Sequence, residues 1–182
     1  MKKIILTFLL FHSITGFSQQ NIYKVFNENM SKQEVLAAYN SNAEKLNSIP
    51  FSTEVSWKVD VERFRYNEDG QLKVVSLIPS NMGNGFNYIK TVTHLKKSRD
   101  FLLDLGYKIT HTNDAWSRPQ AFVGEAFAYG LVLQNPTNKN YVNIYCVKEK
   151  GSYVPLLYIF NKKYLFDHFE ENKASNKQES GF

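Results

Sequence analysis

The chain has 182 residues, of which 43% are hydrophobic and 21% are charged, and its formal net charge is +5. This length suits one domain with a substantial core, and a small charge excess without a dense basic run argues against nucleic-acid binding. Cys146 is the only cysteine, so an intramolecular disulfide is excluded and the core must provide the stability.

The N-terminal residues 1–18 have the three parts of a cleavable signal peptide. Two lysines precede an apolar run over residues 4–11, and Gly16 and Ser18 supply the small residues of a cleavage site. The run is too short to cross a bilayer, and charged residues interrupt every later apolar stretch. We therefore expect an exported protein, periplasmic or secreted, with no integral membrane insertion. No cysteine lies at the cleavage site, so we expect no lipid anchor.

The first predicted helix covers residues 32–46. Ser31 is placed to cap it, and Glu34 follows three residues later, which is the capping-box pattern. Apolar side chains then recur at spacings of three to four residues, which indicates one buried stripe. The members of this stripe are Val35, Leu36, Tyr39, Ala43 and Leu46.

Strict alternation of apolar and polar residues over 55–61 predicts a half-buried antiparallel strand. The alternation changes phase at Phe64, so we expect a β-bulge or a tight turn near residues 62–63. The turn sequence at 67–70 then leads into a strand over 72–78.

A second helix is predicted over residues 87–105, with Gly106 as its left-handed stop. Its expected inner stripe consists of Ile89, Val92, Leu95, Leu102 and Leu105. Strands are then predicted over residues 107–112, 126–133, 141–148 and 153–160. A short helix over 162–169 follows, and residues 172–182 have the composition of a disordered tail.

Together these elements predict an α+β domain over residues 19–171, in which two helical segments pack on an antiparallel β-sheet. The two halves, 22–86 and 87–171, resemble each other weakly, because their helix stripes align and Trp57 aligns with Trp116. This similarity suggests a duplicated helix-plus-hairpin unit, although two amphipathic units also align by chance.

The first half of the chain resembles a known family. Residues 29–35, Trp57 on a strand and the hairpin over 64–72 are similar to the superfamily of small envelope proteins that contains the outer-membrane assembly lipoprotein BamE and tandem β-lactamase inhibitor proteins. The resemblance implies a helical segment packed on an antiparallel sheet, in one copy or two, that is used for protein contacts rather than chemistry. The chain departs from the family because it lacks the lipid-anchor cysteine, and Asn40 and Ser41 stand where a glycine often ends the first helix.

No catalytic, metal or phosphate motif stands out in the sequence. The histidines outside the signal peptide, none of which has a partner at metal-ligand spacing, are His94, His111 and His168. A thiol nucleophile, a base and an orienting acid could in principle come from Cys146, His111 and Asp114. However, Cys146 shares its strand parity with the core residues of 141–148, which favours a buried and inert thiol. We therefore expect no enzyme activity, no cofactor and no metal.

Aromatic residues are dense on the predicted strands. A sheet with aromatic side chains on both faces can bury one face under helices and offer the other face to a partner. The residues expected at such a partner-binding surface are Phe86, Trp116, Tyr141, Tyr145 and Tyr153. Aromatic residues are also common strand formers, so their density alone does not require a binding face.

Two functions remain compatible with these patterns. The first is an exported, non-enzymatic protein-binding module, an inhibitor, an immunity protein or an envelope accessory protein, whose protein partner is unidentified. The alternative is a periplasmic carrier of a small molecule or lipid, in which the aromatic strands and the second helix enclose an aromatic-lined pocket. The carrier requires an apolar cavity between helix and sheet, whereas the binding module requires an exposed apolar patch.

Overall fold

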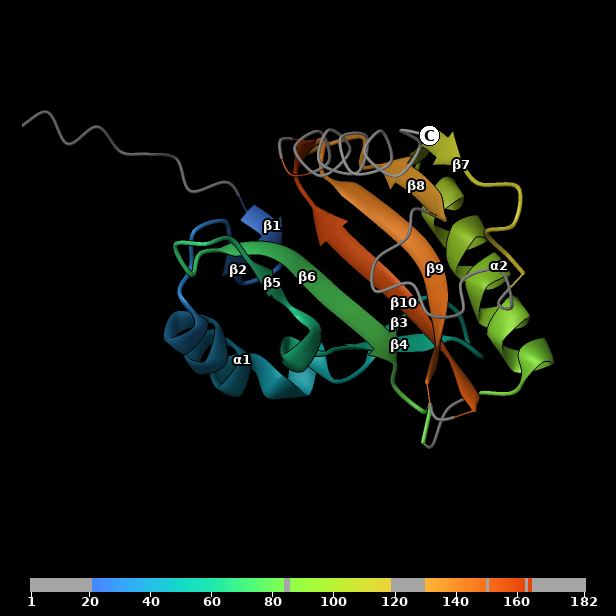
Figure 1. The fold of residues 1–182 in the computed structure, drawn as a ribbon, viewed down its shortest axis with the longest axis horizontal. Coiled ribbons are helices and arrows are strands. Elements are labelled where there is room, and N and C mark those ends of the chain that lie inside the picture. Colours follow the sequence, from blue (N-terminus) through green and yellow to red (C-terminus); the bar gives the residue numbers. More distant parts are fainter. Residues whose placement is uncertain (1–20, 84–85, 119–129, 150, 163, 165–182) are drawn as a thin grey trace, which may run out of the picture.

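Two α-helices and an antiparallel β-sheet form the part of the chain that the computed structural model describes, which confirms the predicted α+β fold (Figure 1). The described residues are 21–83, 86–118, 130–149, 151–162 and 164. The predicted signal peptide over 1–18 and the predicted tail over 172–182 lie outside them, as does most of the helix expected over 162–169.

The main sheet of the described chain has eight strands, and each pairs antiparallel with its neighbours. The strands are β3 (Ile49–Pro50), β4 (Ser56–Val59), β5 (Arg65–Tyr66), β6 (Leu72–Pro79), β7 (Lys108–Thr112), β8 (Leu131–Gln134), β9 (Tyr141–Glu149) and β10 (Ser152–Phe160). Their order is β3-β4-β6-β10-β9-β8-β7, and β5 pairs with β6 beside this path. Two short strands, β1 (Asn21–Tyr23) and β2 (Phe26–Asn27), form a separate antiparallel pair.

Four predicted strands, over 72–78, 107–112, 141–148 and 153–160, are found within one residue of their expected ends. The strand predicted over 126–133 is seen only as β8, because residues 126–129 lie outside the described chain. The long strands β6, β10 and β9 lie next to one another in the middle of the sheet.

Helix α1 (Lys32–Leu46) begins at the predicted capping box. The Ser31 hydroxyl accepts the Glu34 N–H at 3.3 Å, and the Glu34 carboxylate accepts the Ser31 N–H at 2.7 Å. These reciprocal bonds satisfy two backbone donors that a helix start otherwise leaves without a partner.

The stripe predicted for α1 is wrong only at Leu36, because Tyr39 and Ala43 are partly buried and Tyr39 packs against the core. Val35 and Leu46 are buried, whereas Leu36 is 41% exposed. The reason is the position of the helix: α1 packs near the short 3-10 helix η1 (Val61–Arg63) beside the sheet and does not lie across a sheet face (Figure 1). A helix in this place buries a narrow strip rather than a wide one.

The predicted phase change after β4 is confirmed as a tight turn. The strand ends at Val59, earlier than the predicted residue 61, because Asp60 caps η1 and its carboxylate accepts the Glu62 N–H at 3.3 Å. The chain then enters β5 and the predicted turn at 67–70, where Gly70 has a φ of +74°. This left-handed conformation is the one that glycine adopts without strain.

Helix α2 (Tyr88–Asp104) packs against β9 and β10, with Asn87 as its N-cap and Gly106, at a φ of +82°, as the predicted stop. Its predicted inner stripe is wrong at two positions, because Ile89 is 75% exposed and Leu105 is 54% exposed. The residues that α2 buries are Thr91, His94, Leu95, Ser98 and Leu102. They form one regular helical face. Because three of them are polar, the pattern of apolar residues does not predict this face.

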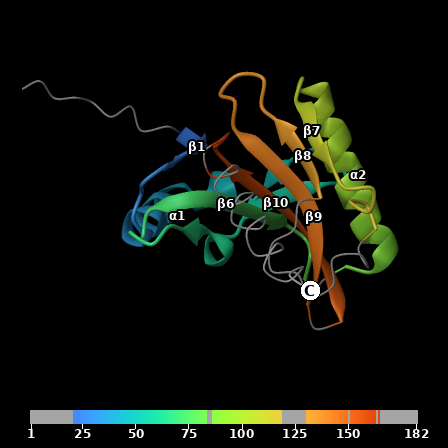
Figure 2. The ribbon, with the colours of Figure 1, turned by 45° about the horizontal axis from the view of Figure 1, so that its top comes forward.

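The central strands bury both of their faces, with a different set of side chains on each. Val142, Ile144 and Cys146 of β9 belong to the cluster that includes residues of α1 and α2, and Tyr141 and Tyr145 belong to a second cluster. This division confirms the predicted alternation along the strand. Figures 1 and 2 show α1 and α2 far apart, at opposite ends of the molecule.

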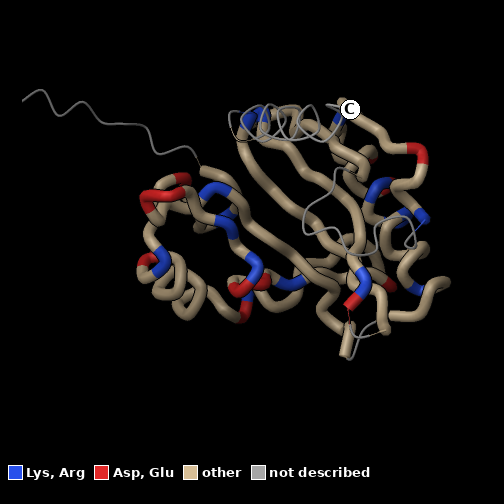
Figure 3. The backbone as a smooth tube through the Cα atoms, viewed as in Figure 1, with Lys and Arg blue, Asp and Glu red and all other residues tan. Residues whose placement is uncertain are grey.

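Charged residues of both signs lie mostly on the helices and connecting segments, and the long central strands carry few of them (Figure 3). Of the helices in the described residues, none is both long enough and apolar enough to cross a membrane. The duplication suggested by the sequence stays a prediction. Trp57 lies on β4, whereas its aligned counterpart Trp116 lies in a turn after β7.

Candidate functional site

The five aromatic residues expected at a partner-binding surface do not form one exposed face. Phe86, Trp116, Tyr141 and Tyr145 are buried, none of them more than 9% exposed, and Tyr153 is partly buried. The expectation that these side chains are exposed is therefore wrong for the first four.

The second face of the sheet is a core, which explains the burial of Tyr141 and Tyr145. The Tyr141 ring stacks on Phe160 with centroids 6.3 Å apart, and the Tyr145 ring lies 5.4 Å from that of Tyr158. Cross-strand aromatic pairs of this kind stabilise a sheet by packing against each other. The sequence alone did not indicate that this face is covered.

Phe86 and Trp116 lie elsewhere in the fold. The Phe86 ring packs 4.5 Å from the His94 ring of α2, and its backbone pairs with that of Tyr153. The Trp116 ring lies under the Arg99 guanidinium, 5.4 Å from its central carbon to the ring centroid. The residues predicted to form one surface therefore lie in separate parts of the fold.

The thiol, base and acid considered from the sequence are not brought together. His111 of β7 is in register with Val132 of β8, which is in register with Asn143 of β9. Paired residues share a face, so His111 lies on the opposite face of the sheet from Cys146, three residues after Asn143. Burial raises the pKa of the Cys146 thiol to about 12, so the thiol is protonated and a weak nucleophile. No group of three or more metal-binding side chains is found among the described residues.

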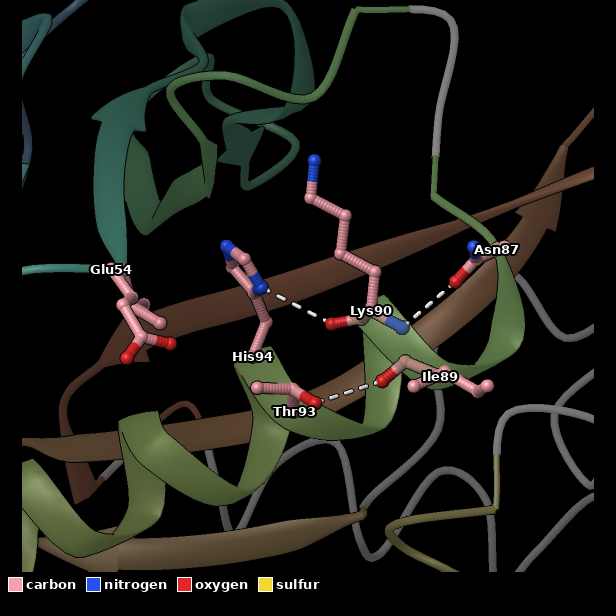
Figure 4. Close-up of a pocket in the computed structure, with 7 residues that line it drawn as sticks. Glu54, Asn87, Ile89, Lys90, Thr93 and His94 are labelled. Carbon is pink, nitrogen blue, oxygen red and sulfur yellow. Dashed lines mark hydrogen bonds between the residues drawn. The ribbon is translucent and has the colours of Figure 1, made fainter.

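A polar pocket of about 340 Å³ lies between the first turns of α2 and the segment that precedes β4 (Figure 4). It is lined by Glu54, Val55, Asn87, Ile89, Lys90, Thr93 and His94. Figure 4 shows the His94 ring directed back toward the Lys90 carbonyl, with Glu54 facing α2 from the segment before β4.

His94 is the buried titratable group of the polar pocket. Its Nδ1 lies 3.1 Å from the Lys90 carbonyl oxygen, and its Nε2 is buried with no hydrogen-bond partner in the described chain. Burial lowers the pKa of the imidazole, and the charges of Lys90 and Lys97 lower it further, although the bond to the Lys90 carbonyl opposes them. The ring is therefore neutral at pH 7, with Nδ1 as the donor.

The charged groups around the polar pocket are already engaged. The Lys97 ammonium forms an ion pair with the Glu54 carboxylate, and the Lys90 ammonium lies 4.4 Å from the centroid of the Phe86 ring. Hydrogen bonds fix the helix side chains of the same region, since Thr93 Oγ1 donates to the Ile89 carbonyl at 3.0 Å. This pocket consequently has few free groups with which to bind a ligand.

An apolar pocket of about 220 Å³ lies farther along α2, between its C-terminal half and the sheet. Its floor consists of aliphatic side chains from the three central strands, Leu77, Val142, Leu157 and Ile159. These residues share the face that α2 covers, because Leu77 is in register with Leu157 and Val142 with Ile159. The floor offers no hydrogen-bonding side-chain atom.

The walls of the apolar pocket come from α2 and from the chain around β3. Phe101, Leu102 and Leu105 form the helix wall, and Ile49, Pro50 and Phe51 form the opposite wall. The Phe51 and Phe101 rings stack with centroids 4.4 Å apart and planes at 25°. This stack fixes the two walls against each other.

Among the described residues that line the apolar pocket, two tyrosines supply the polar side-chain atoms, Tyr23 from β1 and Tyr107 from the segment after Gly106. Asn135 Nδ2 donates to the Tyr107 hydroxyl at 2.7 Å. The buried Asn140 holds β1 in place, because its amide donates to the carbonyls of residues 21 and 22 at 2.8 and 3.0 Å. Burial raises the pKa of both tyrosine hydroxyls, so both are protonated at neutral pH.

Sequence reasoning missed the aromatic residues of this pocket, which are Tyr23, Phe51, Phe101 and Tyr107. Phe101 could have been found, because it lies beside Leu102 and one turn before Leu105 on the predicted helix. For Tyr23 the local sequence gives no signal, since its place depends on Asn140, which is more than a hundred residues away.

Comparisons with known proteins add no relative: no family model, no curated protein and no solved structure matches this chain. The resemblance to the envelope-protein superfamily therefore stays a prediction.

Proposed function

We propose that this protein is an exported, non-enzymatic binding protein whose ligand is a small apolar molecule held in the apolar pocket. The proposal follows the carrier alternative rather than the protein-binding module. The observation that supports it is the pocket itself, a cavity of about 220 Å³ between α2 and the sheet with no charged residue among those that line it. Well-formed apolar pockets with a few polar groups are the usual sites of small-ligand binding.

The burial of the sheet aromatics argues in the same direction. A protein-binding module that uses Tyr141 or Tyr145 needs those side chains at the surface, and both are buried in the second core cluster. The apolar pocket does not depend on these tyrosines, because α2, β3 and the opposite face of the sheet line it.

Ethylbenzene is a suitable first probe, because it is apolar and of the size that the pocket accepts. We expect its addition to the folded protein to shift the backbone amide NMR signals of residues around the apolar pocket, such as Leu102 and Leu157, in a saturable way. A ligand that binds only the folded state also raises the melting temperature.

A pair of tryptophan substitutions provides the test. Leu105 lines the pocket and is 54% exposed, so Leu105→Trp can direct an indole into the cavity and block it, and we expect at least about a tenfold loss of ethylbenzene affinity. Leu103 lies on the same helix, is 38% exposed and does not line the pocket, so Leu103→Trp is the matched control and keeps the affinity within about twofold. Equal affinity in the two variants would show that ethylbenzene binds elsewhere, and the proposal would be wrong.

A further inference from the structure

The apolar pocket joins a floor without polar atoms to a rim with two phenol hydroxyls. We propose that its ligand is an uncharged, one-ring aromatic molecule that carries a hydrogen-bond acceptor, and that the Tyr23 hydroxyl donates to this acceptor. The inference rests on the proposed function and deepens it, because it names the chemical class of the ligand.

The lining of the pocket excludes a charged ligand. None of the lining residues in the described part of the chain is charged, and an ion that is buried without a partner loses several kcal/mol of hydration. The Lys24 ammonium lies 5.6 Å from the centroid of the Tyr23 ring, but it donates to the Lys45 carbonyl at 3.4 Å and is not among the described lining residues. A carboxylate in the pocket would therefore have no counter-ion among the described lining residues.

The volume sets the size of the ligand. A buried apolar cavity of about 150 Å³ takes up benzene, and this pocket measures about 220 Å³. One aromatic ring with a small substituent therefore fits, whereas a long lipid chain does not. The stacked rings of Phe51 and Phe101 in the walls favour a flat ligand over a branched aliphatic one.

The two hydroxyls on the rim differ in how they are held. The Tyr107 oxygen accepts a hydrogen bond from Asn135 Nδ2, which fixes that phenol in place and leaves its own O–H as a second donor. The Tyr23 side chain is partly buried, and its hydroxyl makes no hydrogen bond to another described residue. This hydroxyl can therefore donate to a ligand in the pocket, and the matching ligand group is a carbonyl or ether oxygen.

Three probes of similar size test this inference: acetophenone has a carbonyl acceptor, ethylbenzene has no polar group, and benzoate is charged. Each is titrated into the folded protein and into Tyr23→Phe, with amide NMR shifts as the readout. We expect Tyr23→Phe to weaken acetophenone by about two- to tenfold, the effect of one hydrogen bond, and to leave ethylbenzene unchanged. We expect benzoate to bind at least about a hundredfold more weakly than acetophenone.

The control is Tyr39→Phe, which removes a hydroxyl that donates to Asn47 Oδ1 on α1, away from the lining of the pocket. It should leave the affinities of all three probes unchanged. The ligand class is wrong if Tyr23→Phe weakens acetophenone and ethylbenzene equally, or if benzoate binds as tightly as acetophenone. If neither neutral probe binds the wild-type protein, the proposed function fails instead, so the two failures are distinguishable.

Discussion

The two ends of α2 lie on the same sheet but differ in the side chains that they bury. The N-terminal part, up to Ser98, buries Thr91, His94 and Ser98 beside one apolar residue, Leu95, and the C-terminal part covers the apolar pocket with Phe101 and Leu102. The polar half is tolerated because hydrogen bonds form inside it. Thr91 Oγ1 donates to the Asn87 carbonyl at 2.9 Å, and Ser98 Oγ accepts the indole N–H of Trp57 at 3.1 Å.

The difference shows why the two pockets along α2 differ in their chemistry. Buried polar groups stabilise a fold only when they are paired, so the hydrogen bonds of Thr91 and Ser98 offset the cost of burying them. The C-terminal half has no such requirement, and a cavity among its side chains costs only lost packing contacts. Trp57 separates the two halves, since its ring lies 6.5 Å from the His94 ring and 6.0 Å from the Phe51 ring.

Removal of the Trp57 side chain is expected to cause the largest loss of stability. Trp57 is fully buried and contacts both halves, so we expect Trp57→Ala to lower the free energy of unfolding by about 3–5 kcal/mol. Trp57→Phe keeps a ring but leaves the Ser98 hydroxyl without its donor, and we expect a loss of about 1–3 kcal/mol. Urea unfolding followed by far-ultraviolet circular dichroism measures both. A loss under about 1 kcal/mol for Trp57→Ala would show that the two halves do not depend on this ring.

The second prediction concerns acid sensitivity in the polar half. Burial lowers the pKa of His94 in the folded state, whereas the unfolded chain has an ordinary histidine pKa of about 6.5. As the pH falls through that value the unfolded chain binds the proton first, so stability declines from about pH 7 downward until the lower folded-state pKa is reached. We expect the free energy of unfolding of the wild type, measured in urea, to decrease as the pH is lowered from 8 to 5.

The matched pair for this prediction is His94→Leu and His111→Ala. His94→Leu should flatten the pH dependence, whatever its stability at pH 8. His111 is exposed on β7, so His111→Ala should keep the slope of the wild type. A slope that survives in His94→Leu would assign the acid sensitivity to other groups.

The sequence predicted the features of the fold that depend on neighbouring residues. The capping box at Ser31, the turn after β4 and the stop at Gly106 are each set within a few residues, and each was found. The alternation along β9 was also correct, because side-chain direction follows from strand geometry alone. The placement of β10 between β6 and β9 was beyond prediction, since it depends on contacts between distant strands.

The site was less predictable than the fold. Its residues come from β1, β3, α2 and three central strands, and no periodicity in one segment reports such a meeting. Leu105, which lines the pocket, is exposed although the predicted stripe includes it, because it lies at the C-cap after the last helical residue. The buried face of α2 also includes Thr91, His94 and Ser98, and the hydrogen bonds that allow polar residues there are visible only in three dimensions.

The smallest expected effect concerns the ion pair at the edge of the polar pocket. The Glu54 carboxylate and the Lys97 ammonium form an exposed ion pair there, and the pKa of Glu54 is lowered by the hydrogen bond and the charge of Lys97. Exposed pairs contribute little to stability, and salt screens them. We expect Glu54→Gln to lower the melting temperature slightly at low salt and not at all in about 1 M sodium chloride. The prediction is wrong if Glu54→Gln lowers stability as much as Trp57→Phe does, or if the loss of stability persists in high salt. Either result would show that the Glu54–Lys97 ion pair contributes strongly to the stability of this region.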